Sequence, residues 1–368
     1  MSCDLIPLLG NGCGDWLCVR IDENSLASEV VQWYHGGGDW IPWGNDIAEA
    51  IIFNGCVDRI SAGSRRHAIP AVAQRPTIKR DQDDELLHWA LNHTSGRLGQ
   101  DLNSDLDEQQ TATVLLAAGV AEVAVHCELV LKALCYPDVD ALTHALGRGV
   151  AGIRREQLTE WAFDTSRIPA RYRSQIEAGE SMFTIPEQDW GLASCHARAV
   201  TALAPELAWA WDIIGYSAER SGQMEQAVAA YANAARCSVF TDQSVRMNTH
   251  WASDDSSKFC VGRIQHLSEA TIADSEYLRV LSSVAYSSRR SVITEYWIEQ
   301  AVAQLAADKI EAAHRSYMAA GWDLGAGPIS VYGEIIDRVC ETASNCGQHG
   351  RAAVAATHRR CLQERYGI

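Results

Sequence analysis

Short apolar runs broken by turn residues occupy the N-terminal part of the chain. Three of them are rich in Val, Ile, Trp and Tyr, at residues 15–21, 29–34 and 39–43, a composition typical of β-strands. Three glycines at positions 36–38 separate the second run from the third. The pattern predicts a meander of three strands, which buries too little apolar surface to be stable alone.

Helical signals follow this meander. A polar pair at 45–46 predicts a capped helix over residues 45–52, which the Asn-Gly pair at 54–55 is expected to end. Residues 55–80 are irregular, with scattered Gly, Pro and Arg, and indicate a linker or an extended arm. After them the pattern is helical almost to the end of the chain. Residues 113–135 are apolar on nearly all sides, as expected of one buried helix.

These patterns predict an α+β fold in which a small N-terminal antiparallel sheet precedes a mostly α-helical solenoid. A length of 368 residues suits two or three domains. We expect a sheet domain over 1–54, the linker over 55–80, a helical domain over 81–180 and a helical-repeat domain over 181–368.

The C-terminal half contains an internal repeat. Two sets of small and aromatic residues share one spacing: Trp211, Gly215, Ala227, Tyr231 and Ala234 in the first, and Trp297, Ala301, Ala313, Tyr317 and Ala320 in the second. The spacing resembles the tetratricopeptide repeat, an antiparallel helix pair of about 34 residues. Gly215 and Ala227 therefore predict a close contact between two helices, with Trp211 and Tyr231 filling the space beside it.

The repeat covers residues 190–237 and 291–321, and the last helices, near 329–346 and 349–366, are only similar to it. The two copies are not separated by a multiple of the period, so we expect the array to be interrupted over 241–290. Such arrays expose a curved surface that binds peptides or proteins. Ordinary helical hairpins with coincidental aromatic spacing remain the alternative.

A second resemblance lies at the N-terminus. Three pieces follow one another: Ile-Pro-Leu-Leu-Gly at 6–10, Gly-Asp-Trp-Leu-Cys-Val at 14–19 and Val-Val-Gln-Trp-Tyr-His at 30–35. Their order and spacing resemble the core of the SUKH superfamily. The resemblance implies a twisted α+β sheet that accommodates protein partners, and an immunity role against a bacterial toxin, often a nuclease or deaminase. The helical segment that precedes the first strand in the family is missing, so we expect an N-terminally truncated sheet domain or one covered by the downstream helices.

Four aromatic residues in this region are the candidate binding residues: Trp33, Tyr34, Trp40 and Trp43. Adjacent side chains on a strand point to opposite faces, so Trp33 and Tyr34 cannot both enter the same core. We expect at least one ring to be partly exposed, or covered by another part of the chain. Such aromatic side chains often anchor a protein partner. The alternative is that all four form the core of the small sheet.

No motif indicates catalysis or metal binding. The sequence has no Cys-x2-Cys pair, His-Glu-x2-His motif, P-loop or Gly-x-Ser-x-Gly elbow. The dipeptides His126-Cys127 and Cys195-His196 are neighbours on helices, where adjacent side chains point in different directions. We interpret both as packing residues, and expect no catalytic residue, no cofactor and no metal ligand.

Charge and cysteine content narrow the class of partner. Lys and Arg number 31 against 47 Asp and Glu, for a net charge of −16. This charge disfavours direct nucleic-acid binding and favours a protein partner with a basic surface. Twelve cysteines are spread along a sequence without an export signal or a membrane-spanning apolar run, which predicts free thiols in the cytoplasm.

Our leading interpretation is a non-catalytic bacterial protein-binding protein, an immunity-type inhibitor that blocks a toxin by occluding its surface. The alternative is a scaffold or adaptor whose repeats bind a peptide or a subunit. An enzyme of another family is the third possibility. The sequence does not specify the oligomeric state.

Overall fold

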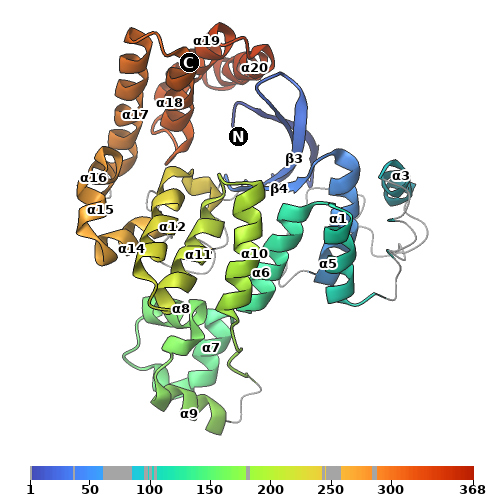
Figure 1. The fold of residues 1–368 in the computed structure, drawn as a ribbon, viewed down its shortest axis with the longest axis vertical. Helices are drawn as coiled ribbons and strands as arrows, with labels where there is room; N and C mark the ends of the chain where they lie inside the picture. The colour runs from blue at the N-terminus through green and yellow to red at the C-terminus, as the bar shows by residue number, and fades with distance from the viewer. Residues whose placement is uncertain are drawn as a thin grey trace.

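The structure, a computed structural model, consists of one antiparallel sheet followed by a long succession of helices (Figure 1). It describes residues 2–35, 38–60, 85–94, 106–179, 183–242, 258–283 and 288–368, together with residues 98, 102 and 245. The order of sheet and helices confirms the α+β, mostly helical class.

The sheet has four strands in the order β1-β2-β3-β4, and every neighbouring pair is antiparallel. The three predicted strands are β2 (Trp16–Ile21), β3 (Ala27–Trp33) and β4 (Trp40–Gly44). A fourth strand, β1 (Leu5–Gly10), is not among the three that composition predicts. It contains Pro7, which has no backbone N–H and is therefore tolerated on an edge strand, the position that β1 occupies.

The helix after the sheet is longer than expected. α1 (Ile47–Ile60) does not end at the Asn-Gly pair but continues through it. A Cβ atom added to Gly55 would lie 3.3 Å from the side chain of Leu87, which belongs to α3 (Glu85–His93). Gly55 therefore packs against α3 and remains helical, although the Asn-Gly pair by itself favours the end of a helix. Of the predicted linker, only residues 55–60 are described, and they are helical; the remainder lies outside the described residues.

The apolar stretch at 113–135 forms parts of two helices instead of one. α5 (Glu108–Ala117) ends before Gly119, and α6 (Glu122–Leu134) begins after it. Gly119 and Ala121 both have positive φ angles, of 69° and 49°. This left-handed backbone reverses the chain and interrupts the helix.

The next three helices form a small unit with its own apolar cluster, around Leu142, Trp161 and Ile176. They are α7 (Val139–Leu146), α8 (Arg155–Phe163) and α9 (Ala170–Ala178). The remaining helices follow in chain order: α10 (Trp190–Leu203), α11 (Ala208–Arg220), α12 (Met224–Arg236), α14 (Phe259–Leu267), α15 (Glu269–Ala273), α16 (Glu276–Ser283), α17 (Arg289–Ala306), α18 (Ile310–Trp322), α19 (Ile329–Asn345) and α20 (His349–Tyr366).

Several of the predicted repeat residues are buried between helices. The helices α11 and α12 form one hairpin, and α17 and α18 form another. A Cβ atom on Gly215 would lie 2.6 Å from the ring of Tyr231, so only glycine fits this contact without displacement. Ala227 and Tyr231 are completely buried, and the atoms nearest to Gly215 belong to Tyr231, which we expect beside the contact. The predicted interruption contains the shorter helices α14, α15 and α16.

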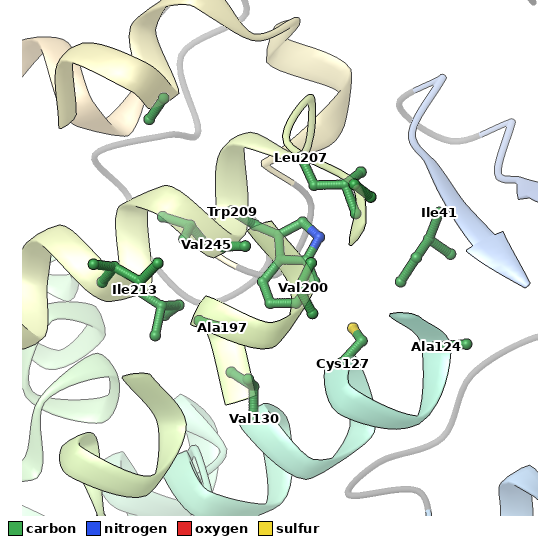
Figure 2. Packing of buried hydrophobic residues seen from close by; sticks show 14 of the residues in the cluster. Ile41, Ala124, Cys127, Val130, Ala197, Val200, Leu207, Trp209, Ile213 and Val245 are labelled. Carbon is green, nitrogen blue, oxygen red and sulfur yellow. The ribbon is translucent and has the colours of Figure 1, made fainter. Parts of the chain in front are cut away.

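One large core joins the sheet to the helices. Figure 2 shows Ile41 of β4, Cys127 of α6 and Val200 of α10 within this cluster. Trp209 of α11 belongs to the same cluster and is 1% exposed. The cluster contains residues on both sides of positions 54 and 180, where we expect domain boundaries.

The sheet also contacts the last hairpin, at the other end of the sequence. The helices follow an arc from α6 to α20, and the sheet lies between its two ends (Figure 1). The backbone N–H of Gly350 donates to Ser25 Oγ at 2.7 Å, and Arg351 Nε donates to the carbonyl of Ile21 at 3.0 Å. Cys3 is buried in the apolar cluster of α17–α20. These contacts close the arc into a ring.

Candidate functional site

A central cavity of about 780 Å³ lies where the sheet faces the repeats. This volume is within the range of ligand-binding pockets, about 300–1,000 Å³. The strands β2, β3 and β4 contribute one wall, and α12, α17, α18 and the segment after α18 contribute the other. The aromatic residues of the lining come from both walls: Trp33, Trp40, Phe240, Trp297, Trp322 and Tyr332.

Three tryptophans form a row across the sheet. Trp16 of β2 pairs directly with Trp33 of β3, and Trp33 pairs with Trp40 of β4. Directly paired residues of an antiparallel sheet share one face, so the three rings lie on the face that borders the cavity. A Cβ atom on Gly10 would lie 3.2 Å from the ring of Trp16, so glycine at this position leaves room for the ring.

Arg20 continues the same face of the sheet and has several partners. Its guanidinium lies 4.2 Å from the ring centre of Trp40, a cation–π contact. It also forms ion pairs with Asp4 at 3.5 Å, with Glu206 at 3.4 Å, and with Glu29. Burial raises the pKa of Glu29 even though Arg20 opposes the shift. The charge of Arg20 is therefore balanced within the protein, and its contacts hold Trp40 in place.

A buried polar network supports the opposite wall. Lys258 and Asp323 are 3% and 6% exposed and form an ion pair. The hydroxyl of Tyr277 and the indole Nε1 of Trp297 donate to the same carboxylate oxygen of Asp323, at 2.6 and 2.8 Å. Burial raises the pKa of Tyr277, so its hydroxyl stays protonated and donates. Trp297, predicted as a repeat residue, is in this way fixed at the cavity wall.

Two further arginines line the cavity, Arg236 on α12 and Arg315 on α18, and both are exposed. Arg236 forms a hydrogen bond with the side chain of Asn233 at 3.4 Å. Among the residues that the structure describes, neither arginine forms an ion pair with an acidic side chain. They differ in this respect from Arg20, and Arg315 also lines a smaller pocket together with the acidic residues Asp4, Glu23 and Glu311.

The candidate binding residues occupy three environments. Trp33 and Trp40 are half-buried and line the cavity, whereas Tyr34 is half-buried against the main core. The expectation that Trp33 and Tyr34 enter different surroundings is therefore met. Trp43 is completely buried and packs edge-on against Phe53 of α1, with ring centres 4.7 Å apart. Its side chain cannot contact a partner, because it is part of the core.

Sequence reasoning did not select Trp16, which is 37% exposed. The Gly-Asp-Trp motif marks this residue, but only the strand register shows that it extends the row begun by Trp33 and Trp40. Arg236 and Arg315 carry no sequence signal, because only the tertiary structure brings both to the cavity.

The structure brings together two histidines that we interpret as separate packing residues. The Nδ1 atoms of His126 on α6 and His196 on α10 are 3.0 Å apart. Burial, together with the neighbouring His196, lowers the pKa of His126 to about 4, and burial also lowers the pKa of His196. No cluster of three or more His, Cys, Asp or Glu residues suited to a metal ion occurs within the described ranges. The pair thus acts as a neutral helix–helix hydrogen bond.

None of the twelve cysteines, all of which lie in the described ranges, forms a disulfide, and six of them are buried. Burial raises the pKa of Cys18 and of Cys237 to about 12, which keeps both as thiols. In the described part of the chain, no helix is both long and apolar enough to cross a lipid bilayer.

Comparison of the chain with protein-family models, with curated proteins and with solved structures found no match.

Proposed function

We propose that this protein is a non-catalytic binding protein that receives a segment of a partner protein in the central cavity. The neighbouring rings of Trp33 and Trp40 carry the proposal, since they line the same cavity as Trp297 and Trp322 on the opposite wall. Tryptophan provides a large rigid apolar surface and dominates the energy of many protein interfaces. The rings are held by the sheet and by the repeats, so they are already placed before a partner arrives.

The finer role that we propose is that of an immunity-type inhibitor in the bacterial cytoplasm, which neutralises a toxin by occluding its surface. The SUKH-like pieces at 6–10, 14–19 and 30–35 support it. A four-stranded antiparallel sheet followed by helices agrees with that resemblance in outline. The net charge of −16 supports a partner with a basic surface, such as a nuclease, because opposite charges accelerate encounter. Association should then slow as salt concentration rises.

The second candidate is a scaffold or adaptor, and the tetratricopeptide-like hairpins favour it. Small residues of both hairpins are completely buried, Ala227 in α12 and Ala301 and Ala313 in α17 and α18, and α12, α17 and α18 contribute to the cavity wall. The two candidate roles use the same binding site but differ in their effect on the activity of the partner. An inhibitor abolishes the activity of its partner, whereas an adaptor leaves that activity intact.

Affinity capture with variants of the full chain tests the proposal. Trp33→Ala should lose the partner that the wild-type protein retains, by at least about 10-fold, as expected for an aromatic anchor. Trp89→Ala is the control, because Trp89 is 39% exposed and lies on α3 outside the cavity lining. Circular dichroism establishes that both variants fold. Equal capture by Trp33→Ala and the wild type would contradict the proposed site.

Activity of the captured partner separates the two roles. Addition of the wild-type protein should abolish the activity of an isolated toxin, and Trp33→Ala should not. If the partner is captured through Trp33 but stays fully active, the adaptor role replaces the inhibitor role.

A further inference from the structure

A second groove lies on the C-terminal hairpins, apart from the central cavity. Its volume is about 450 Å³, and its sides come from α17 and α19. Tyr317 of α18, which is 4% exposed, belongs to its floor. The described residues that line this groove are all different from those that line the cavity, so the two surfaces are separate.

The helix α17 presents an apolar stripe along the groove. Ile298, Val302 and Leu305 follow one another at intervals of four and three residues, which places them on one face of the helix. Val302 is 54% exposed and Leu305 is 38% exposed. Ile293 and Ala301 of the same helix are buried and supply its inward contacts. The stripe is therefore an apolar face that the described part of the chain leaves uncovered.

The opposite side of the groove is also apolar. Val331 and Ile335 lie four residues apart on α19, one helical turn from each other, and both line the groove. Apolar side chains on two helices, with an aromatic ring between them, form the kind of groove that receives the apolar face of a third helix. The stripe from Ile298 to Leu305 is about 10 Å long, so two to three turns of such a helix cover it.

The charged side chains around the groove are mostly acidic. Glu295 and Glu299 each precede a stripe residue by three positions, and Glu334 lines the groove on α19. None of these three carboxylates forms a hydrogen bond or an ion pair within the described ranges. Asp308 and Lys309, in the turn after α17, offset each other.

The arginines at the groove do not cancel this negative charge. Arg359 pairs with both carboxylate oxygens of Asp337 at 2.9 Å, and Arg338 pairs with Glu341 at 2.9 Å. Each arginine balances one acid, so the carboxylates of Glu295, Glu299 and Glu334 remain in excess. The charge of the groove has the same sign as the net charge of the chain, −16.

From the apolar stripe and its acidic surroundings we infer that the groove binds an amphipathic helix with a basic polar face, supplied by a partner protein. The apolar face of this helix packs against Val302 and Ile335, and its Lys or Arg side chains lie beside Glu299 and Glu334. A second copy of this chain is disfavoured, because it would bring an acidic molecule to an acidic groove. The inference concerns a surface beyond the proposed site and does not depend on the central cavity.

Selection of helical peptides on the immobilised full chain tests the inference. The probe is a phage-displayed library of helical peptides 18 residues long, randomised on one half of the helix surface. Wild-type protein should enrich sequences with Leu, Ile or Met at helical spacing, flanked by Lys or Arg. Val302→Glu should bind the selected peptides at least about 10-fold more weakly in fluorescence anisotropy, as expected for the loss of a central apolar contact. Leu192→Glu is the control, because Leu192 is 47% exposed and lies on α10 outside the groove.

A second pair of variants tests the acidic side chains without disturbing the apolar stripe. The double variant Glu299→Gln with Glu334→Gln should weaken binding about 5-fold at low salt and reduce its salt dependence. Glu177→Gln with Glu225→Gln changes the net charge equally, at exposed positions of α9 and α12 outside the groove. This control should bind the peptides like the wild type.

The outcomes separate this inference from the proposed function. Trp33→Ala should bind the selected peptides like the wild type. Peptides that Trp33→Ala loses and Val302→Glu retains would lie in the central cavity, which would overturn the groove and support the proposed function. Enrichment of acidic or uncharged helices, or failure to select any peptide, would overturn the inference and leave the cavity as proposed. A dimer in size-exclusion chromatography that Val302→Glu dissociates would show that a second copy covers the groove, and would also overturn it.

Discussion

Tryptophan shows how one residue type acquires different roles within ten positions of this chain. Trp33 points to the cavity face of the sheet, because it pairs with Trp16 and Trp40. Trp43 lies where the register between β3 and β4 shifts, and its ring is completely buried against Phe53. Both residues lie in strands rich in aromatic and β-branched residues, so composition does not distinguish them. Only the pairing of the strands shows that the Trp33 ring borders the cavity and the Trp43 ring lies in the core.

Gly215 permits a direct test of the repeat contact. Gly215→Ala should lower the free energy of unfolding by about 1–3 kcal/mol, because the new Cβ would meet the Tyr231 ring at 2.6 Å. Tyr231 cannot move away freely, since its hydroxyl donates to Glu219 at 3.0 Å. Urea denaturation measures the change.

The control for this substitution is Gly262→Ala. Gly262 lies within the helix α14 and has no atom within 4 Å of its Cβ position. Alanine there should be neutral or stabilising by about 0.5–1 kcal/mol, since it has the higher helix propensity. Equal effects of the two substitutions would refute the close contact.

The histidine pair predicts a loss of stability on acidification. An imidazole in the unfolded chain has a pKa of about 6.5, whereas burial in the folded protein lowers the pKa of His126 to about 4 and also lowers that of His196. As pH falls below about 6.5 the unfolded chain takes up protons that the folded protein does not, so the free energy of unfolding decreases. Two protonated rings would also place N–H donors against each other at a separation of 3.0 Å.

Variant His126→Gln should reduce this pH dependence. Between pH 7 and 5 it should lose about 1–2 kcal/mol less than the wild type in urea denaturation. His266→Gln, at an exposed position of α14, should keep the wild-type profile. A His126→Gln profile parallel to that of the wild type would show that the pair does not titrate in this way.

At the scale of elements, a single ion pair joins several helices of the C-terminal half. Lys258 precedes α14, and Asp323 follows α18. Their partners Tyr277 and Trp297 belong to α16 and α17, and Lys258 also donates to the carbonyl of Ala235 on α12 at 2.8 Å. These buried polar contacts thus stabilise the segment between the two repeat copies, where the repeat spacing is interrupted.

Lys258→Met should therefore be strongly destabilising. It leaves the carboxylate of Asp323 buried without a cation, which costs about 3–5 kcal/mol in comparable cases. Lys132→Met is the matched control, because the Lys132–Glu108 pair is exposed and such pairs contribute about 0–1 kcal/mol. Thermal and urea denaturation should separate the two variants clearly. Similar losses would mean that the buried pair is no more important than a surface pair.

For the whole molecule, the continuous core predicts cooperative unfolding. The main cluster includes Leu17 of the sheet, Val130 of α6 and Phe259 of α14, so it spans the boundaries expected at 54 and 180. Tryptophan fluorescence and far-ultraviolet circular dichroism should follow one coincident transition in urea. A chain lacking residues 1–54 should bind more of a hydrophobic dye than the intact chain. Two separated transitions, or an unchanged truncated chain, would support an independent sheet domain.

The sequence by itself determined the order of sheet and helices and three of the four strands, and it marked Gly215 as a residue of a helix–helix contact. These features depend on neighbours in the chain, on strand composition and on helix periodicity, which are local properties. Two helix predictions from local sequence were wrong. The helix α1 extends past Gly55, where it packs against Leu87 of α3. The single helix expected over 113–135 is broken at Gly119, where the backbone is left-handed.

Tertiary structure alone decided the cavity and its chemistry. The contact between Ser25 and Gly350 joins opposite ends of the chain, and the pairing of His126 with His196 joins two helices. Which tryptophans share a face, and which side chains line the cavity, depend on strand register and ring closure. The energies that fix these arrangements come from contacts between distant residues, which no local pattern records.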